Sequence, residues 1–226
     1  MNTSSSTPRL FCALFALLVA ACCLALATGA VSVNPFYVFI DWLRGESGDA
    51  TARFILTELR IPRALGALLV GAVLAQSGAA MQGLFRNPLA DPALIGISAG
   101  AAVGAIASLI LVPESFRSQH PLGLLQMPLA GLLGGWLRAV AVYKTGNRSG
   151  RVSVTAMLLA GIAVNAFAGA LTGLFIFVAD DQQLRSINFW MLGSLGHISL
   201  NTLLWFSPLL ILSALGLSRY ASALDA

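Results

Sequence analysis

The sequence predicts an all-α membrane protein in which residues 1–226 form one polytopic bundle of about six transmembrane helices. Hydrophobic residues make up 58% of the chain and charged residues only 10%, whereas about 25% of a soluble domain is charged. The mean hydropathy is +0.84. The apolar residues are grouped into runs long enough to cross a bilayer, and short polar segments separate these runs.

The same composition excludes several functions. The net charge of +4 comes mostly from scattered arginines that form no basic face with aromatic residues, so nucleic acid is not an expected partner. Cys12, Cys22 and Cys23 all lie in the first apolar run and predict neither a disulfide framework nor a metal site. The chain has no Walker A, HExxH or GxGxxG motif, so we expect neither an ATPase nor a metalloenzyme.

The first apolar run, Leu10–Val33, is long enough to form a transmembrane helix. Two alternatives remain for it. Small residues at 27–30 are compatible with a cleaved signal peptide, and the residues before Cys22 resemble a lipoprotein cleavage site. An uncleaved helix is the simpler interpretation, because the downstream chain is also apolar.

The polar segment Asn34–Leu59 predicts an extramembrane connection that holds short helices. The second run then begins with Pro62 in its first turn, where a missing N–H removes no helical hydrogen bond. This predicted helix continues to about Gly83. Arg60 and Arg63 lie at its outer end.

The segment Arg86–Pro92, RNPLADP, predicts a tight turn between the second and third runs. Pro88 and Pro92 exclude a continuous helix. Asn87 and Asp91 have side chains suited to capping the structure that follows.

The third run, Ala93–Val112, carries Gly96, Gly100 and Gly104 at intervals of four residues. Glycines on one helix face let a neighbouring helix approach to backbone contact, so the three residues predict helix packing.

The same run contains a second pattern, because residues 96–100 match G-x-S-x-G, the nucleophile motif of serine hydrolases. An intramembrane serine protease that uses Ser98 is therefore a remote alternative. It would need a base within hydrogen-bond reach, and both His120 and His197 fall in predicted loops.

Arg138 lies inside the fourth run, close enough to its end that the sequence predicts a side chain extending to the membrane surface. The basic loop after this run, with Lys144, Arg148 and Arg151, predicts a cytoplasmic position. Both chain ends are then cytoplasmic. The last three predicted runs are Met127–Tyr143, Thr155–Ala179 and Thr202–Leu217.

The segment between the fifth and sixth runs, SINFWMLGSLGHIS, is too short and too polar to span a membrane. It predicts a short surface helix anchored by Phe189 and Trp190, or a re-entrant piece beside a pore.

Three long motifs resemble one family of transporters. RIPRALGALLVGAVLAQSGAAMQGLFRNPLADPALIGISAGAAVGA, MLLAGIAVNAFAGALTGLFIF and QLRSINFWMLGSLG are similar to the permease subunits of the ATP-driven importers for iron–siderophores, haem and vitamin B12. The resemblance implies a bacterial inner-membrane permease with a family fold of roughly ten helices.

It also implies an assembly: two permease copies, a cytoplasmic ATPase dimer that binds ATP and Mg, and a periplasmic substrate-binding protein. The permease pair would move haem or a ferric siderophore by alternating access. The chain itself is then no enzyme and binds no cofactor of its own, and membrane lipid surrounds it.

The resemblance assigns roles to matching residues. Arg60 and Arg63 occupy the arginine pair that docks the binding protein, unless they only mark the positive end of a membrane segment. The cytoplasmic gate falls on a turn and on the start of the fifth run: Asn87, Pro88, Leu89, Val154 and Thr155.

The segment ADDQQLRSINFWMLGSLG is most similar to the haem-import branch of the family. This resemblance implies that Arg185 faces the pathway and pairs with a porphyrin propionate. Asn165 is a further candidate for the pathway. His197 is a candidate for transient ligation of haem iron, or else an incidental loop residue. Siderophore import is the main alternative, and cobalamin import is a third.

In the resembled family, the loop after the sixth helix carries the coupling helices that contact the ATPase, and this sequence ends at Ala226. We therefore expect a truncated or frame-shifted product, or an incomplete gene model, that lacks the coupling loop and later helices. A non-transporting membrane fragment or scaffold is the corresponding alternative function.

Overall fold

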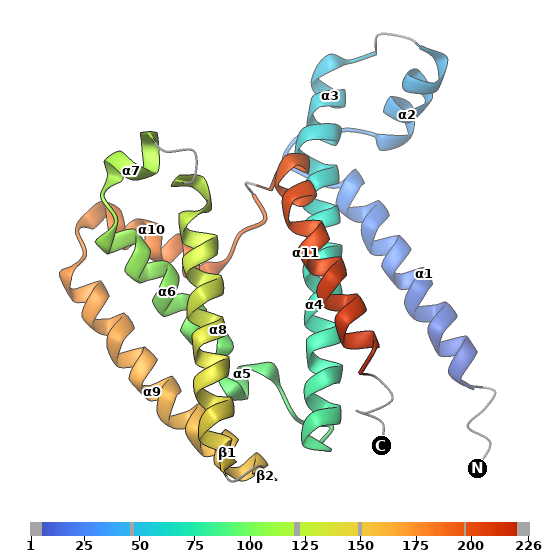
Figure 1. The fold of residues 1–226 in the computed structure, drawn as a ribbon. Coiled ribbons are helices and arrows are strands. Elements are labelled where there is room, and N and C mark those ends of the chain that lie inside the picture. The colour runs from blue at the N-terminus through green and yellow to red at the C-terminus, as the bar shows by residue number, and fades with distance from the viewer. Residues whose placement is uncertain (1–5, 46–47, 120–122, 149–150, 197, 221–226) are drawn as a thin grey trace. The chain divides into compact units, whose positions relative to one another are not determined.

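The computed structural model describes residues 6–45, 48–119, 123–148, 151–196 and 198–220. This described part is helical apart from two short strands and the connecting turns (Figure 1). Its internal contacts divide it into two compact units. Unit 1 comprises Met1–Leu74 and Leu195–Ser218, and unit 2 comprises Ala75–Ser194 and Arg219–Ala226.

The helices of the described chain match the six predicted apolar runs. The third and fourth runs correspond to the shorter helix Ile97–Leu111 and to the arginine-containing helix Gln126–Gly146. The predicted all-α, multi-pass architecture is therefore confirmed. Within the described ranges, four helices are long and apolar enough to cross a membrane: Thr7–Ala27, Ala50–Phe85, Val154–Val178 and Leu200–Ser218.

Unit 1 contains two membrane-length helices and the short helices predicted between them, together with the last helix. Side chains start the short helices: Asn34 Oδ1 accepts a 3.0 Å hydrogen bond from Phe36 N, and Asp49 Oδ1 accepts one of 2.9 Å from Thr51 N. The elements are α1 (Ser6–Ala27), α2 (Pro35–Arg44), α3 (Ala50–Phe54), a π-helical turn (Ile55–Arg60), the first part of α4 (Ile61–Phe85) and α11 (Leu200–Ser218).

Pro62 lies in the first turn of α4, as predicted, but the membrane helix does not start there: α3 and a π-helical turn precede α4 without a break, so the helical span runs from Ala50 to Phe85. Pro62 has no N–H, and in an α-helix its ring would clash with the carbonyl four residues before it. A π-helical turn precedes it, in which Ile61 N donates to Leu56 O, five residues earlier. The wider turn accommodates the ring without ending the helix.

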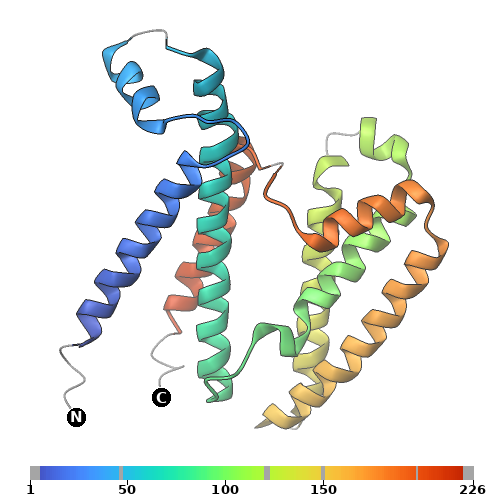
Figure 2. The same ribbon diagram turned by 180° about the vertical axis from the view of Figure 1, so that it is seen from behind.

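Unit 2 contains three packed helices, α6, α8 and α9, together with α10, which contacts α6 and passes across α6 and α8 in Figure 2. A two-residue antiparallel ladder joins α8 to α9, with Asn147 opposite Val152 and Arg148 opposite Arg151. The elements are the end of α4, α5 (Pro92–Ile95), α6 (Ile97–Leu111), α7 (Glu114–Gln119), a 3₁₀ turn (Gly123–Leu125), α8 (Gln126–Gly146), β1 (Asn147–Arg148), β2 (Arg151–Val152), α9 (Val154–Val178) and α10 (Asp181–Leu192).

The predicted single helix Ala93–Val112 is broken at Gly96, which is a second correction. Gly96 has φ +74°, a conformation that ends α5 before α6 starts at Ile97. Only a residue without a Cβ adopts this conformation at little cost. Gly96 therefore makes a turn and does not continue a helix face.

The glycine contact between α6 and α8 involves the two remaining predicted glycines. A Cβ on Gly100 would lie 2.6 Å from the carbonyl oxygen of Gly134, and a Cβ on Gly104 would overlap the carbonyl group of Ala130. The backbones of α6 and α8 thus touch, because Gly100, Gly104 and Gly134 have no side chains to keep them apart.

The helix α10 begins at Asp181, earlier than the predicted surface helix. A capping box starts it: Asp180 Oδ1 accepts from Gln183 N at 2.8 Å, while Gln183 Oε1 accepts from Asp180 N at 3.1 Å. Ile187 of α10 is fully buried against Ile106 and Leu109 of α6. Apolar packing therefore fixes α10 on unit 2.

Candidate functional site

The turn between α4 and α5 is built by two short polar side chains. Asn87 Oδ1 accepts a 2.9 Å hydrogen bond from Leu89 N, and Asp91 Oδ1 accepts one of 2.6 Å from Ala93 N. The second bond caps α5, as predicted. Arg86, just before the turn, has φ +49°. The two side chains thus pair the backbone N–H groups of Leu89 and Ala93 within the turn.

This turn is attached to α8 and α9 by a hydrophobic cluster that we call the inner cluster. Val154, at the start of α9, packs against it. The structure therefore brings the two predicted gate segments, Asn87–Leu89 and Val154–Thr155, to the same end of unit 2. Leu89 itself is 84% exposed. The buried members of the inner cluster are Phe85, Ala90, Ile95, Val142, Met157 and Ala160.

Arg138 does not extend to the membrane surface as predicted, because its side chain is only 5% exposed inside unit 2. It lies twelve residues after the start of α8, about 18 Å along the helix axis. Nη2 donates to the carbonyl oxygen of Gly161 at 3.3 Å and to Oδ1 of Asn165 at 2.5 Å. Nearby acceptors on α9 thus hold the charge inside the helices.

Two glycines of α5–α6 make room for this guanidinium. A Cβ on Gly96 would overlap Arg138 Nη2 and Asn165 Oδ1, and a Cβ on Gly100 would lie 2.8 Å from Arg138 Cβ. We call Arg138, Asn165 and the adjoining backbone of Gly96 and Gly161 the polar clasp. Arg138, Asn165 and Gly96 are each candidates from the sequence, but no signal in the sequence pairs Arg138 with Asn165.

Arg60, predicted to dock a partner, is 7% exposed and binds the end of α1. Its Nη1 donates to the carbonyl oxygens of Leu26 at 2.6 Å and Ala27 at 3.0 Å, and Nη2 donates to that of Val31. The last carbonyls of a helix lack helical partners and carry partial negative charge, so a guanidinium is well placed there.

Arg63 differs from Arg60 because its side chain is exposed. Its Nη2 donates to the carbonyl oxygen of Gly196 at 3.1 Å. A single bond to one nitrogen leaves most of the guanidinium open to a carboxylate. Of the two predicted docking arginines, Arg63 presents the accessible cation in this structure.

The predicted substrate residues are not brought together. Arg185 is exposed on α10, whereas Asn165 is part of the polar clasp on α9. His197 lies outside the described residues, as does His120. Ser98 is exposed on α6, and the structure describes neither histidine that could serve as its base.

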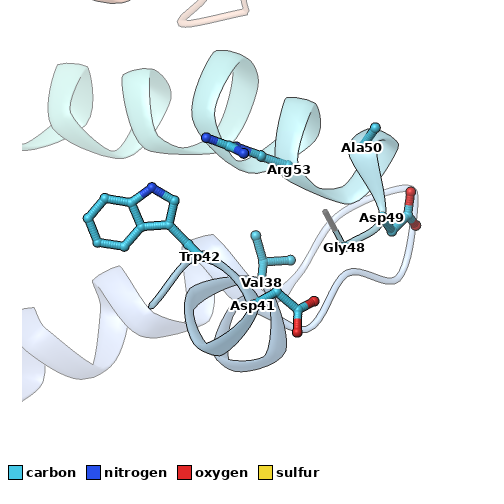
Figure 3. A pocket seen from close by; sticks show the side chains of 7 residues that line it. All are labelled: Val38, Asp41, Trp42, Gly48, Asp49, Ala50 and Arg53. Atoms are coloured by element: carbon cyan, nitrogen blue, oxygen red, sulfur yellow. The ribbon is translucent and has the colours of Figure 1, made fainter. Parts of the chain in front are cut away.

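A pocket of about 130 Å³ between α2 and α3 was not predicted from the sequence. Figure 3 shows Trp42 and Arg53 toward one end of it and Asp41 and Asp49 toward the other. Pockets for drug-sized ligands occupy about 300–1,000 Å³, so this one is too small for a porphyrin. The pocket is lined by Val38, Asp41, Trp42, Gly48, Asp49, Ala50 and Arg53.

Comparison with known proteins adds a family match and several relatives. Residues 17–226 match the model of the FecCD transport family. A hemin transport system permease protein of Yersinia pestis is 40% identical over 82% of this chain and 54% of its own length. A vitamin B12 import system permease protein of Salmonella paratyphi A is 36% identical over 70% of this chain and 44% of its own length.

Two further similarities agree with these. A cobalamin import system permease protein of Halobacterium salinarum is 37% identical over 64% of this chain and 37% of its own length. A solved structure described as an inward-facing, metal-chelate type ABC transporter has a TM-score of 0.78 and 27% identity, over 96% of this chain and 64% of that one. The chain thus spans about half, or less, of the length of each of the three curated relatives.

Proposed function

Because the chain belongs to the FecCD transport family, we propose that it acts as the membrane permease of an ATP-driven importer for haem or a ferric siderophore in a bacterial inner membrane. The observation that carries this proposal is the match over residues 17–226, together with 40% identity to a hemin permease. The predicted family resemblance is confirmed. We favour haem over cobalamin as the substrate because the vitamin B12 relative is less similar to this chain, at 36% identity.

The proposed importer contains a second copy of the permease, a cytoplasmic ATPase dimer and a periplasmic substrate-binding protein. ATP and Mg bind to the ATPase, and the chain supplies the pathway by alternating access. Apolar helices and the absence of nucleotide-binding motifs from the sequence support this division of labour.

Arg63 supplies the docking cation for the binding protein in this proposal. Its exposure supports the role, since a guanidinium can form two parallel hydrogen bonds to a carboxylate. Arg60 supports the same region from inside by fixing the end of α1 to the helix that carries Arg63. The pair therefore divides into one docking residue and one positioning residue.

The proposed cytoplasmic gate comprises Asn87, Pro88, Leu89, Val154 and Thr155. The inner cluster supports both segments, because Ala90, next to Leu89, is a buried member of it and Val154 packs against it. An exposed leucine on a hydrogen-bonded turn is a suitable obstruction, because the turn holds it without covering it. Movement of α9 against the turn would change the opening.

Arg185 is the proposed partner of an anionic group on the substrate, such as a propionate. It is exposed on a helix that Ile187 anchors to α6. His197 stays a candidate ligand for haem iron. Arg185→Ala and His197→Ala would each lower uptake of haem if both residues contact it.

Reconstitution in proteoliposomes tests the proposed function. The chain is combined with the ATPase and binding protein of its own importer, and ATP-dependent uptake of haem, a ferric siderophore and cobalamin is measured. Uptake of haem or the siderophore is expected. Assembly with both partners but no uptake of any substrate would favour a non-transporting membrane scaffold. Labelling of Ser98 by a fluorophosphonate probe would favour the protease alternative.

A further inference from the structure

We propose that Arg138 and Asn165 are positioning residues: their polar clasp fixes the break at Gly96 and thereby holds the turn Asn87–Leu89 against α9. The inference about position stands on the geometry of unit 2. Its consequence for transport rests on the proposed function, in which this turn belongs to the gate.

Arg138 places a positive charge inside the packed helices of unit 2. Ionisable side chains inside membrane-spanning segments are expensive and usually have a functional reason. Among the described residues, no carboxylate pairs with this guanidinium, and its buried Nε and Nη1 have no acceptor. A pair of apolar side chains would fill the same space without unpaired donors. Stability alone therefore does not account for an arginine here.

The polar clasp contacts the break between α5 and α6. Gly96, the residue with φ +74°, lies directly against Arg138 Nη2 and Asn165 Oδ1, since a Cβ would overlap both atoms. The guanidinium of Arg138 and the amide of Asn165 thus pack directly against the backbone at the α5–α6 break. Any movement of Gly96 toward α9 would require this hydrogen bond to move as well.

The helix α5 has only four residues and follows a turn. A helix of one turn has no stability of its own, so contacts must set its position. Ile95 supplies one contact by packing in the inner cluster, and Gly96 supplies the other at the clasp. Arg138 lies one helical turn from Val142, a member of that cluster. Clasp and cluster therefore adjoin each other.

The test measures the position of the turn directly. Spin labels are placed at Leu89→Cys and Thr155→Cys in the full chain, with Cys12, Cys22 and Cys23 replaced by alanine, in lipid nanodiscs. Pulsed EPR then gives the distribution of label distances. Asn165→Leu removes the acceptor and should shift or broaden the distribution clearly. Asn165→Asp keeps an acceptor and should leave it narrow.

Leu137→Ala is the matched control, since Leu137 adjoins Arg138 but is exposed on α8. This variant should leave the distribution of label distances unchanged. If Asn165→Leu misfolds, the double variant Arg138→Met with Asn165→Leu removes both polar groups, and it should fold but show the broad distribution. A narrow distance distribution in both Asn165→Leu and the double variant would overturn the proposal. Equal broadening in Asn165→Asp and Asn165→Leu would also overturn it.

The readout needs neither ATP nor a substrate, so it is independent of the proposed function. The expected EPR pattern combined with no uptake by the reconstituted importer would reject transport and keep the clasp. Normal uptake combined with an unchanged distance distribution in all variants would reject the clasp and keep transport.

Discussion

Arg138 on α8 donates a 2.5 Å hydrogen bond to the side-chain oxygen of Asn165 on α9, 27 residues further along the chain. The bond joins two apolar helices at a point away from either end of α9. A membrane interior offers little water as an alternative partner, so neither group is easily satisfied if the other is removed.

A double-mutant cycle on this pair should be strongly non-additive. Asn165→Leu should lower the free energy of unfolding by about 1–3 kcal/mol, because a buried charged donor loses its side-chain acceptor and keeps only the longer bond to Gly161 O. Adding Arg138→Met should recover part of that loss, since both polar groups are then gone. Unfolding in a detergent titration, followed by circular dichroism, measures both values. A double variant less stable than Asn165→Leu alone would contradict the prediction.

The backbone contact of α6 with α8 predicts a second effect. Gly100→Ala should destabilise the chain by about 1–3 kcal/mol, because the new methyl group would overlap Gly134 O and the Arg138 side chain. Gly169→Ala on α9 is the matched control. A Cβ there meets nothing within 4 Å, and alanine favours a helix over glycine. Thermal unfolding in detergent should separate the two variants, and equal stability would refute the packing argument.

Arg63→Ala should weaken binding of the substrate-binding protein by about tenfold and reduce the sensitivity of that binding to salt, because an exposed cation steers and pairs with an acidic partner. Surface plasmon resonance on nanodiscs at two salt concentrations measures this. Arg53→Ala is the control, since Arg53 is also an exposed arginine of unit 1. Unchanged affinity in Arg63→Ala, or equal loss in both variants, would remove Arg63 from the docking surface.

Arg60→Met should act on the fold and not directly on docking. Loss of the bonds to Leu26, Ala27 and Val31 leaves the last carbonyls of α1 without their guanidinium, which predicts a loss of about 1–3 kcal/mol in the free energy of unfolding. The same detergent titration checks it. Wild-type stability in this variant would show that the contact with α1 contributes little.

Leu89→Ala should increase passive leakage through the reconstituted importer without ATP, because the turn would keep its shape while its exposed obstruction becomes smaller. Release of trapped substrate from proteoliposomes measures leakage. The control is Leu129→Ala. Leu129 is also an exposed leucine but lies on α8, so this variant should leave the leakage unchanged. If the importer with Leu89→Ala leaked no more than the wild type, Leu89 would not be part of the gate.

Local chemistry made most of the architecture predictable from the sequence. Hydropathy and run length predicted the membrane helices, and the prolines of RNPLADP with Asn87 and Asp91 predicted a capped turn. These properties depend on a residue and its near neighbours. Even the errors at Pro62 and Gly96 concern local geometry, in which the chain selected a π-helical turn in one place and a left-handed glycine in the other.

The sequence by itself thus determined the membrane class, the family and the positions of the helices, because apolar runs and long motifs persist in any arrangement of the chain. Only the tertiary structure decided what each arginine does. Arg138 is buried inside unit 2, and Arg60 binds the carbonyl groups at the end of α1, whereas Arg63 is exposed. The physical reason is that a guanidinium binds whichever acceptors lie within reach, and the folded helices bring those acceptors from residues far away in the chain.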